Sequence, residues 1–288
     1  MPQVISQDKK SSSTIAIPNT LSTFTISNFQ FLLGISLLAM TWVIFSLSAT
    51  KPALPSITQT INYSPSLPDF SVYKDVKLKK LNFFRYLYPI VDTENQHILR
   101  LRNSLLALKA KGATQLTNEQ TTWLHKLAQH YKVNDENINT LINALLLRVD
   151  IIPVSLVLAQ AAIESGWGSS RFALEGNNLF GQWCFKKGCG IVPQSRQEDK
   201  QHEVADFKSI NASVRAYLRN LNTFPAYQEL RKLRSIDRGK SGHINANSLV
   251  QGLEHYSEQG EVYTDKVFKL MRQNKLSTFV ANQSQPSL

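Results

Sequence analysis

Apolar positions first gather in one long stretch near the N-terminus. The segment from Phe29 to Ala49 contains no charged residue, and about 20 such residues span the apolar interior of a bilayer as a helix. We therefore predict a transmembrane anchor at residues 29–49. A disordered N-terminus rich in Ser and Thr is expected before it at 1–28, and an extended, Pro-containing linker after it at 50–73.

Two other interpretations of this apolar stretch stay open: a signal peptide that is removed, and a helix buried in a core. A signal peptide has small residues at its cleavage site, which Ser46 and Ala49 would provide. The long leader before the stretch favours an anchor that is kept. Lys9 and Lys10 precede the stretch and only Lys51 follows it closely, so the positive-inside rule leaves the rest of the chain outside the cytoplasm.

The apolar positions of residues 74–148 recur every three or four residues, which indicates a helical region. Pro89 is expected to end a first helix, and a second helix follows at 94–111. Thr117, with Gln three residues later, has the pattern of a capping box and predicts the start of a third helix. A fourth helix is expected at 137–148.

The segment from Ile151 to Ile163 is apolar on nearly all sides, so its helix is expected at the centre of a domain. Pro153 suits the first turn of that helix. Residues 182–207 hold turn-forming Gly and Pro residues and predict a short β-hairpin. The pattern thus predicts a mainly α domain with a small hairpin lobe at 149–276, and a flexible tail at 277–288. Three further helices are expected in this domain, near 210–223, 247–256 and 263–274.

Glu164 is the acidic residue that follows this apolar run, in the last turn of the predicted helix. Burial disfavours a carboxylate, and so does the negative end of a helix, so both effects raise the pKa of Glu164. A carboxyl group that keeps its proton near neutral pH can act as a general acid. The alternative is an acid that caps the helix end or pairs with a buried arginine such as Arg171.

Cys184 and Cys189 are the two cysteines of the chain. Their spacing does not match a redox CxxC pair, and no second Cys/His pair completes a zinc site. A short hairpin closed by a disulfide fits the gap and requires an oxidising compartment, although two free thiols in a loop are the alternative. The six histidines show no metal-ligand spacing, so we expect no metal and no cofactor.

The net charge of +11 and the pI of about 9.6 favour an anionic partner. Nucleic acid, acidic lipid headgroups and a negatively charged wall polymer all satisfy that condition. No zinc finger, RNA-recognition motif or aromatic-basic platform is present in the sequence, so we expect no nucleic-acid partner. We also expect a monomer.

Two sequence elements resemble the endo-β-N-acetylglucosaminidase family of bacterial autolysins and flagellar muramidase-like proteins. They are Ala161–Gly168 (AAIESGWG) and Asn177–Gly181 (NNLFG). The similarity extends to the Bax-like members of Gram-negative bacteria through Arg148–Pro153, the cysteine pair and Leu221–Tyr227. It covers roughly residues 75–275.

The resemblance implies a lysozyme-like α+β fold: a buried helix that ends in the catalytic glutamate, a small β-hairpin lobe, and a cleft between them. In this chain a helical region and the transmembrane helix precede that fold. The family's catalytic acid corresponds to Glu164, and a supporting tyrosine to Tyr263, which is otherwise a packed aromatic residue. The residues expected to contact the sugar are Trp167, Asn178, Phe180 and Gly181.

Glycosidases of this kind usually need a second carboxylate. In the wider family it lies in the hairpin lobe, which here offers Glu198, Asp199 and Glu203; Glu198 is the first choice. Bax-like members do not fix a carboxylate there, so Glu198 is alternatively a solvated loop charge. The N-acetyl group of the substrate can then assist instead. Glu175 is nearer in sequence, but is expected to end a short helix.

The resemblance therefore predicts a glycoside hydrolase that cleaves the β-1,4 linkage after N-acetylglucosamine in peptidoglycan. A non-catalytic peptidoglycan-binding protein with a degenerate cleft is one alternative. A wall-peptide amidase is another, although the zinc site or Cys/His pair that such enzymes use is not visible. The expected location is the bacterial inner membrane, held by the N-terminal anchor, with the catalytic domain in the periplasm.

Overall fold

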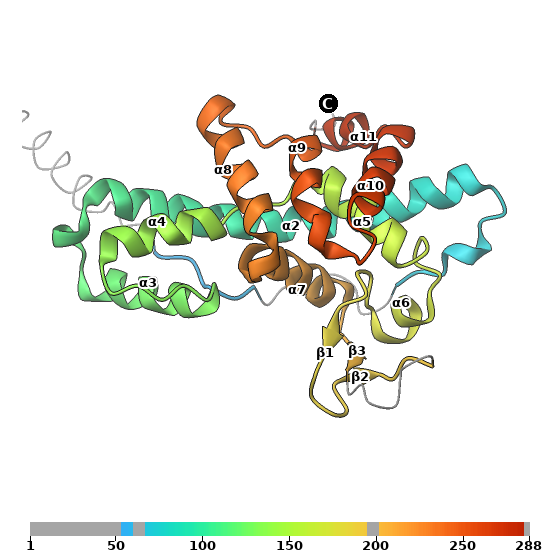
Figure 1. Ribbon diagram of the computed structural model, residues 1–288, viewed down its shortest axis with the longest axis horizontal. Coiled ribbons are helices and arrows are strands. Elements are labelled where there is room, and N and C mark those ends of the chain that lie inside the picture. The colour runs from blue at the N-terminus through green and yellow to red at the C-terminus, as the bar shows by residue number, and fades with distance from the viewer. Residues whose placement is uncertain (1–52, 60–66, 195–201, 285–288) are drawn as a thin grey trace, which may run out of the picture. The chain divides into compact units, whose positions relative to one another are not determined.

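The computed structural model describes residues 53–59, 67–194 and 202–284. The predicted disordered N-terminus and the predicted anchor at 29–49 lie outside these ranges. Within them, no helix is long and apolar enough to cross a membrane. The chain from Leu54 onward is one compact unit, and Figure 1 labels its elements.

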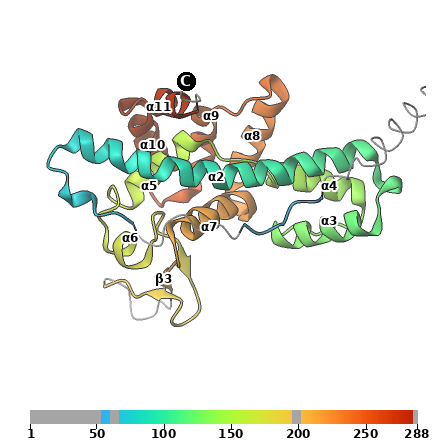
Figure 2. The same ribbon diagram turned by 180° about the vertical axis from the view of Figure 1, so that it is seen from behind.

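The longest described element is α2 (Val76–Lys111). It is capped by Asp75, whose carboxylate accepts hydrogen bonds from the backbone of the first turn. The prediction that Pro89 ends a helix is wrong, because α2 continues through it. Proline removes one helical hydrogen bond and costs about 3 kcal/mol. Buried side chains on both sides of the proline, among them Leu87 and Ile90, keep the helix packed against its neighbours. In Figure 2, α2 runs across the other helices.

Two shorter helices, α3 (Asn118–His130) and α4 (Ile138–Arg148), lie beside the C-terminal half of α2. The predicted capping box is confirmed: the hydroxyl of Thr117 accepts from the Gln120 backbone, and the Gln120 side chain accepts from the Thr117 backbone. Short 3-10 turns, η1 (Phe70–Val72) and η2 (Ala113–Gln115), flank α2.

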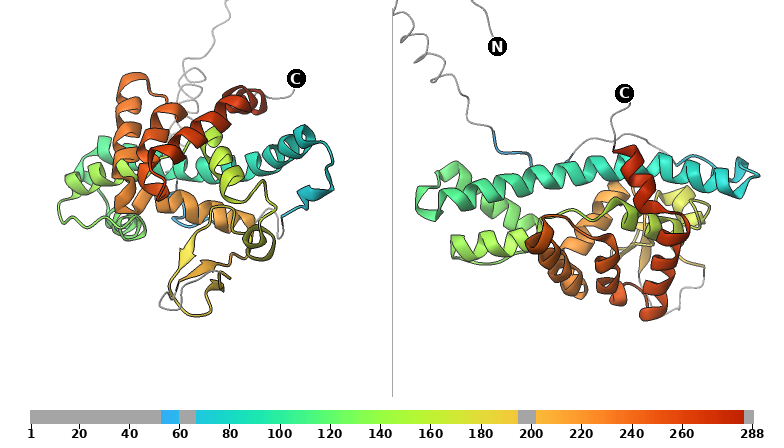
Figure 3. Two further views of the ribbon diagram at one scale, coloured as in Figure 1. Left: turned by 45° about the vertical axis from the view of Figure 1, so that its right-hand side comes forward. Right: turned by 90° about the horizontal axis from the view of Figure 1, so that it is seen from above.

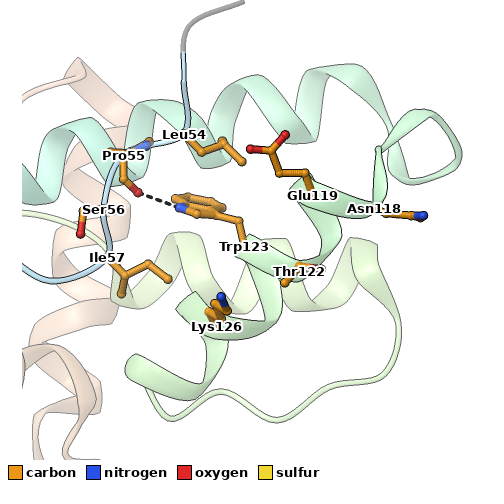
Figure 4. Close-up of a pocket in the computed structure, with 9 residues that line it drawn as sticks. All are labelled: Leu54, Pro55, Ser56, Ile57, Asn118, Glu119, Thr122, Trp123 and Lys126. Carbon is orange, nitrogen blue, oxygen red and sulfur yellow. Dashed lines mark hydrogen bonds between the residues drawn. The ribbon is translucent and has the colours of Figure 1, made fainter.

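Part of the predicted linker is packed against these helices. The indole Nε1 of Trp123 donates to the carbonyl oxygen of Pro55 at 2.8 Å, as Figure 4 shows. The backbone oxygen of Ile57 is 3.2 Å from Nε2 of His97 on α2. A hollow of about 490 Å³ lies between residues 54–57 and α3. The linker residues 54–57 are therefore held on the helical region.

Helix α5 (Val154–Glu164) is the predicted central helix. Every residue from Ser155 to Ala162 is buried, and α2, α9, α10 and α11 pack around it. One continuous core includes side chains of α2, α3, α4 and α5 as well as of the later helices. The helical region at 74–148 and the domain predicted at 149–276 therefore share a single core.

The small lobe follows α6 (Arg171–Gly176) and is a three-stranded antiparallel sheet of β1 (Trp183–Cys184), β2 (Gly190–Ile191) and β3 (Glu203–Ala205). Its order is β1-β3-β2, because β1 and β2 each pair with β3. The predicted small β lobe is therefore confirmed. Gly190 is required here, because a Cβ atom would lie 2.0 Å from the Val204 oxygen. Figure 3 shows this sheet set apart from the helices.

The remaining elements are helical, as predicted. The structure adds α8, which the apolar pattern did not indicate, and α11, which occupies most of the predicted flexible tail and packs on α5. The bounds are α7 (Ile210–Thr223), η3 (Pro225–Tyr227), α8 (Gln228–Ser241), α9 (Ala246–Val250), η4 (Gln251–Tyr256), α10 (Glu261–Gln273) and α11 (Leu276–Gln283).

A buried polar centre around Asp150 fastens these helices together. Its carboxylate, 2% exposed, forms ion pairs with Arg102 of α2 at 3.3 Å and Arg238 of α8 at 2.8 Å. Arg234, 1% exposed, donates to the backbone oxygens of Asp150 and Ile151 and to the side chain of Asn222. The segment between α4 and α5 is thereby tied to both α2 and α8.

Candidate active site

Glu164 is the last residue of α5, and its side chain is half-buried. Burial raises the pKa of Glu164, while a hydrogen bond from Tyr263 and the positive charge of Lys266 oppose that rise without cancelling it. Arg171, the arginine considered as a structural partner, pairs instead with Glu175 at 3.8 Å. The carboxyl group is thus set up to hold a proton at higher pH than an exposed glutamate.

Gln160 lies one turn before Glu164 and fixes the surrounding hydroxyl groups. Its Nε2 donates to the Tyr263 hydroxyl at 2.8 Å, and its Oε1 accepts from the Tyr217 hydroxyl at 2.5 Å. A tyrosine hydroxyl has one proton. Because the Tyr263 oxygen accepts from Gln160, its own proton is available for the Glu164 carboxylate.

Four tyrosines surround the acid. Burial, together with the Glu164 charge, raises the pKa of Tyr217, Tyr256 and Tyr263, and it raises the pKa of Tyr227 to about 12. The Tyr256 ring stacks on Tyr263, with centroids 5.3 Å apart. These phenols stay protonated at neutral pH and present hydroxyl groups, not charges, to the site.

Sequence reasoning placed Tyr263 here but missed Tyr217, Tyr227 and Tyr256. For Tyr217, the sequence pattern predicted only a position on the inward face of a helix. Tyr227 belongs to the Leu221–Tyr227 element, which supported the family resemblance without indicating a place in the site. Tyr256 falls at the end of η4 with no local signal.

Gly181 is the residue of the Asn177–Gly181 turn that faces the acid. A Cβ atom on Gly181 would be 4.0 Å from Oε2 of Glu164, and its φ of +63° is one that side chains disfavour. The glycine therefore leaves the space in front of the carboxyl group open.

The other predicted sugar-contacting residues of this turn are buried. The Asn178 amide nitrogen donates to the backbone oxygens of Gln182 and Ala205, and its oxygen accepts from the backbone of Phe180 and Gln182. The Phe180 ring stacks on Tyr217 at 3.9 Å between centroids. Asn178 and Phe180 thus hold the turn that places Gly181.

Trp167 packs on α2 through edge contacts with Phe83 and Phe84, at 5.9 and 5.3 Å between centroids. The amine of Lys80 lies 4.9 Å from its ring centroid. Trp167 was predicted to contact the sugar, and these contacts show that its ring packs against the core.

The second carboxylate is not among the described neighbours that act on the pKa of Glu164, which are Tyr263 and Lys266. Glu198 and Asp199 lie outside the described residues. Glu203 is buried and accepts hydrogen bonds from the backbone nitrogens of Gly188 and Gly190, at 2.9 and 2.8 Å. This carboxylate therefore braces the loop between β1 and β2.

The predicted disulfide joins Cys184 to Cys189, with Cα atoms 6.2 Å apart. It closes the loop between β1 and β2, whose backbone Glu203 also holds. The two sulfur atoms and a Glu203 oxygen lie within 4.8 Å of one another, but disulfide sulfurs are not the thiolates that bind metals.

Comparisons with known proteins agree with this geometry. Residues 139–276 match the glucosaminidase family, described as mannosyl-glycoprotein endo-beta-N-acetylglucosaminidase. The chain is 36% identical over 214 residues to the protein named Protein bax of Escherichia coli (strain K12), which covers 74% of this chain and 76% of that protein. It is 26% identical over 141 residues to Exo-glucosaminidase LytG of Bacillus subtilis (strain 168), covering 49% of this chain and 44% of that one.

The match to LytG thus spans less than half of either protein. No solved structure is a significant match to the chain. The extent of the match to Protein bax and the family match over the segment that carries Glu164 establish the relationship. The chain belongs to the glucosaminidase family and is similar to Bax.

Proposed function

We propose that the chain hydrolyses the β-1,4 linkage after N-acetylglucosamine in bacterial peptidoglycan, with Glu164 as the general acid. The observation that carries the proposal is the setting of Glu164: a half-buried carboxyl group at the end of α5, with a raised pKa, a hydroxyl partner and an open approach at Gly181. Family membership supports the reaction class, and the glucosaminidase named LytG supports the sugar.

In the proposed reaction, protonated Glu164 gives its proton to the glycosidic oxygen as the bond to the sugar carbon breaks. The carboxylate that remains is stabilised by the Tyr263 hydroxyl and by the charge of Lys266. Gln160 keeps the Tyr263 hydroxyl directed at Glu164 throughout. The same groups that limit the pKa rise in the resting state thus stabilise the charge formed during the reaction.

Water then adds at the sugar carbon, and the proton that it releases returns to the Glu164 carboxylate. The bond-breaking step also needs a group that assists at the sugar carbon. Glu198, on the segment 195–201, is one candidate, and the N-acetyl group of the substrate is the other. A Glu198→Gln variant separates them, because it removes most activity only if Glu198 is the assisting group.

We place the domain on the outer side of the bacterial inner membrane, held by the predicted anchor at 29–49. The disulfide between Cys184 and Cys189 supports an oxidising compartment such as the periplasm.

The test is to incubate the full-length chain, in mild detergent, with purified peptidoglycan and to identify the products by mass spectrometry. Wild type and the control Glu258→Gln, an exposed carboxylate, should release fragments with new N-acetylglucosamine reducing ends. Glu164→Gln should lose about 100-fold or more of that activity.

Two results contradict the proposal. Release of peptides without new reducing ends would indicate an amidase. Sedimentation of wild type with the polymer, without any product, would indicate a binding protein.

A further inference from the structure

A second groove opens beside the candidate acid. Three separate segments line it: Lys132 just after α3, Gln182 and Trp183 at the start of the small lobe, and residues of α7 that include Arg219 and Asn220. Its volume is about 340 Å³. We call it the Trp183 groove.

The Trp183 groove adjoins Glu164 along two paths. Gln182 directly follows Gly181, which faces the Glu164 carboxyl group, and neighbouring Cα atoms are about 3.8 Å apart. Asn220 hydrogen-bonds to Tyr227, whose pKa responds to the charge of Glu164. A polymer bound at Glu164 therefore passes next to this groove.

The groove is lined by two cationic side chains, Lys132 and Arg219, and by the amide side chains of Gln182 and Asn220. Lys132 and Arg219 are both exposed and form no ion pair within the described ranges. Among the residues that the structure describes, those that line the groove include no carboxylate. The Nε of Arg219 donates to the His130 backbone oxygen at 3.2 Å, which uses one of the five N–H donors of a guanidinium. The groove thus offers positive charge to an anionic group.

Lys132 is held in place by its backbone. Its φ of +55° is uncommon for a side-chain-bearing residue and costs about 1 kcal/mol or more. Arg148 donates to the backbone oxygens of both Tyr131 and Lys132 at 2.8 Å, which fixes this turn. The backbone from which the Lys132 side chain extends is therefore fixed at a corner of the helical region.

Trp183 adds a flat apolar surface. Its side chain is 57% exposed, and its ring stacks on His202 with centroids 4.0 Å apart. One face of the ring is thus supported from within the small lobe. Such an exposed, supported ring suits an amphipathic ligand with an apolar part.

We propose that the Trp183 groove binds the carboxylate-bearing peptide that hangs from the glycan strand. Lys132 and Arg219 pair with a peptide carboxylate, and Trp183 covers an apolar part of the peptide. In the intact strand the lactyl carboxyl of each N-acetylmuramic acid is joined to the peptide as an amide, so the free carboxylates belong to the peptides and a cationic groove selects the peptide. Removal of the peptide leaves a carboxylate close to the sugar ring and none at the distance of the peptide. This inference rests on the proposed function and adds the prediction that the enzyme prefers strands that keep their peptides.

The test compares two forms of one polymer: glycan strands with their peptides, and the same strands after enzymatic removal of the peptides. For the full-length chain, kcat/KM for reducing-end release is measured on both forms, and sedimentation binding is measured in parallel. Wild type should favour the peptide-bearing form by about tenfold, the scale of one charge-assisted contact.

The groove variant is Lys132→Gln with Arg219→Gln, and Trp183→Ala is a second variant that leaves the charge unchanged. Both variants should lose the preference, because their kcat/KM should fall on the peptide-bearing form and stay unchanged on the peptide-free form. The matched control is Arg100→Gln with Lys109→Gln, which removes the same charge from exposed positions of α2 and should behave as wild type.

Equal loss on both polymer forms, or no loss on either, overturns the peptide assignment. If wild type cleaves neither form, the proposed function fails, and sedimentation then decides the inference separately. Weaker binding of the groove variant to the peptide-bearing form alone supports it, and unchanged binding overturns it.

Discussion

Asp150 and Glu164 lie near opposite ends of α5, and their surroundings shift their pKa values in opposite directions. Burial raises the pKa of Asp150, but the hydrogen bond from Arg238 and the charges of nearby arginines outweigh it, so the net pKa is lowered. Burial also raises the pKa of Glu164, and there Tyr263 and Lys266 only partly oppose it. The surroundings of Asp150 thus favour its ionised form, and those of Glu164 favour its protonated form.

The difference comes from the partners. Guanidinium groups are permanently charged and hold a carboxylate in its ionised form. The Tyr263 hydroxyl is neutral, so it hydrogen-bonds to Glu164 without removing the ability of that carboxyl group to hold a proton. We infer that Asp150 contributes to stability and Glu164 to chemistry, and the following variants test that contrast.

The largest effect is expected for Glu164→Gln, with a loss of about 100-fold to 10,000-fold in kcat/KM on peptidoglycan. The free energy of unfolding of this variant should not fall with its activity. Because the folded pKa of Glu164 is raised, the wild type loses stability as pH rises from the unfolded pKa through the folded one. The variant lacks that loss, so urea unfolding at pH 7 should show it to be at least as stable as wild type.

Asp150→Asn should destabilise the fold by about 3–5 kcal/mol, because it leaves Arg102, Arg234 and Arg238 buried or half-buried without their counter-charge. Urea unfolding at pH 7 measures this. The exposed residue Glu136 provides the control, since Glu136→Gln should change little. An Asp150→Asn protein of wild-type stability would show that the arginine cluster does not depend on this charge.

The pH dependence of stability sharpens the same contrast. The folded pKa of Asp150 is lowered, so its contribution is complete above the unfolded pKa of about 4 and is lost as pH falls through the folded value. The unfolding free energies of wild type and Asp150→Asn should therefore converge at low pH. Curves that stay parallel down to pH 2 would contradict this assignment.

Tyr263→Phe should lower kcat/KM by about tenfold, the scale of one hydrogen bond to a charged group. It should also move the alkaline limb of the pH–rate profile upward. The Tyr263 hydrogen bond lowers the pKa of Glu164, so its removal lets the acid keep its proton to higher pH. Tyr88→Phe, which loses a hydrogen bond to Ser284 on the surface, is the control. An unchanged alkaline limb in the pH–rate profile would show that Tyr263 does not influence the pKa of Glu164.

The smallest effect is expected for Lys266→Gln. Its charge also lowers the pKa of Glu164, so the alkaline limb should again move upward. The shift should be smaller than for Tyr263→Phe and should fade as salt is added, because Lys266 is exposed and its charge is screened. Lys269→Gln, on the outer side of the same helix, should leave the profile unchanged.

Part of the fold could be predicted because local patterns were clear. The all-round apolar run predicted α5, and the Thr117 capping box predicted the start of α3. Helix α8 left no such signal, because the buried face that it presents includes Arg231 and Arg234 beside Leu230. Arginines on a helix usually indicate a solvated face, and only the buried backbone and amide oxygens that accept from Arg231 and Arg234 make these positions part of the core.

The sequence by itself determined the central helix, the acid at its end and the cysteine pair, because each depends on residues that are close in the chain. Only the tertiary structure decided what surrounds the acid. Gln160 meets Tyr217 and Tyr263 across 57 and 103 residues of chain, and Asp150 meets Arg238 across 88. Such contacts depend on how helices pack, which local periodicity does not encode. The same physics sets the two pKa shifts, since burial and partner charge are properties of the folded neighbourhood.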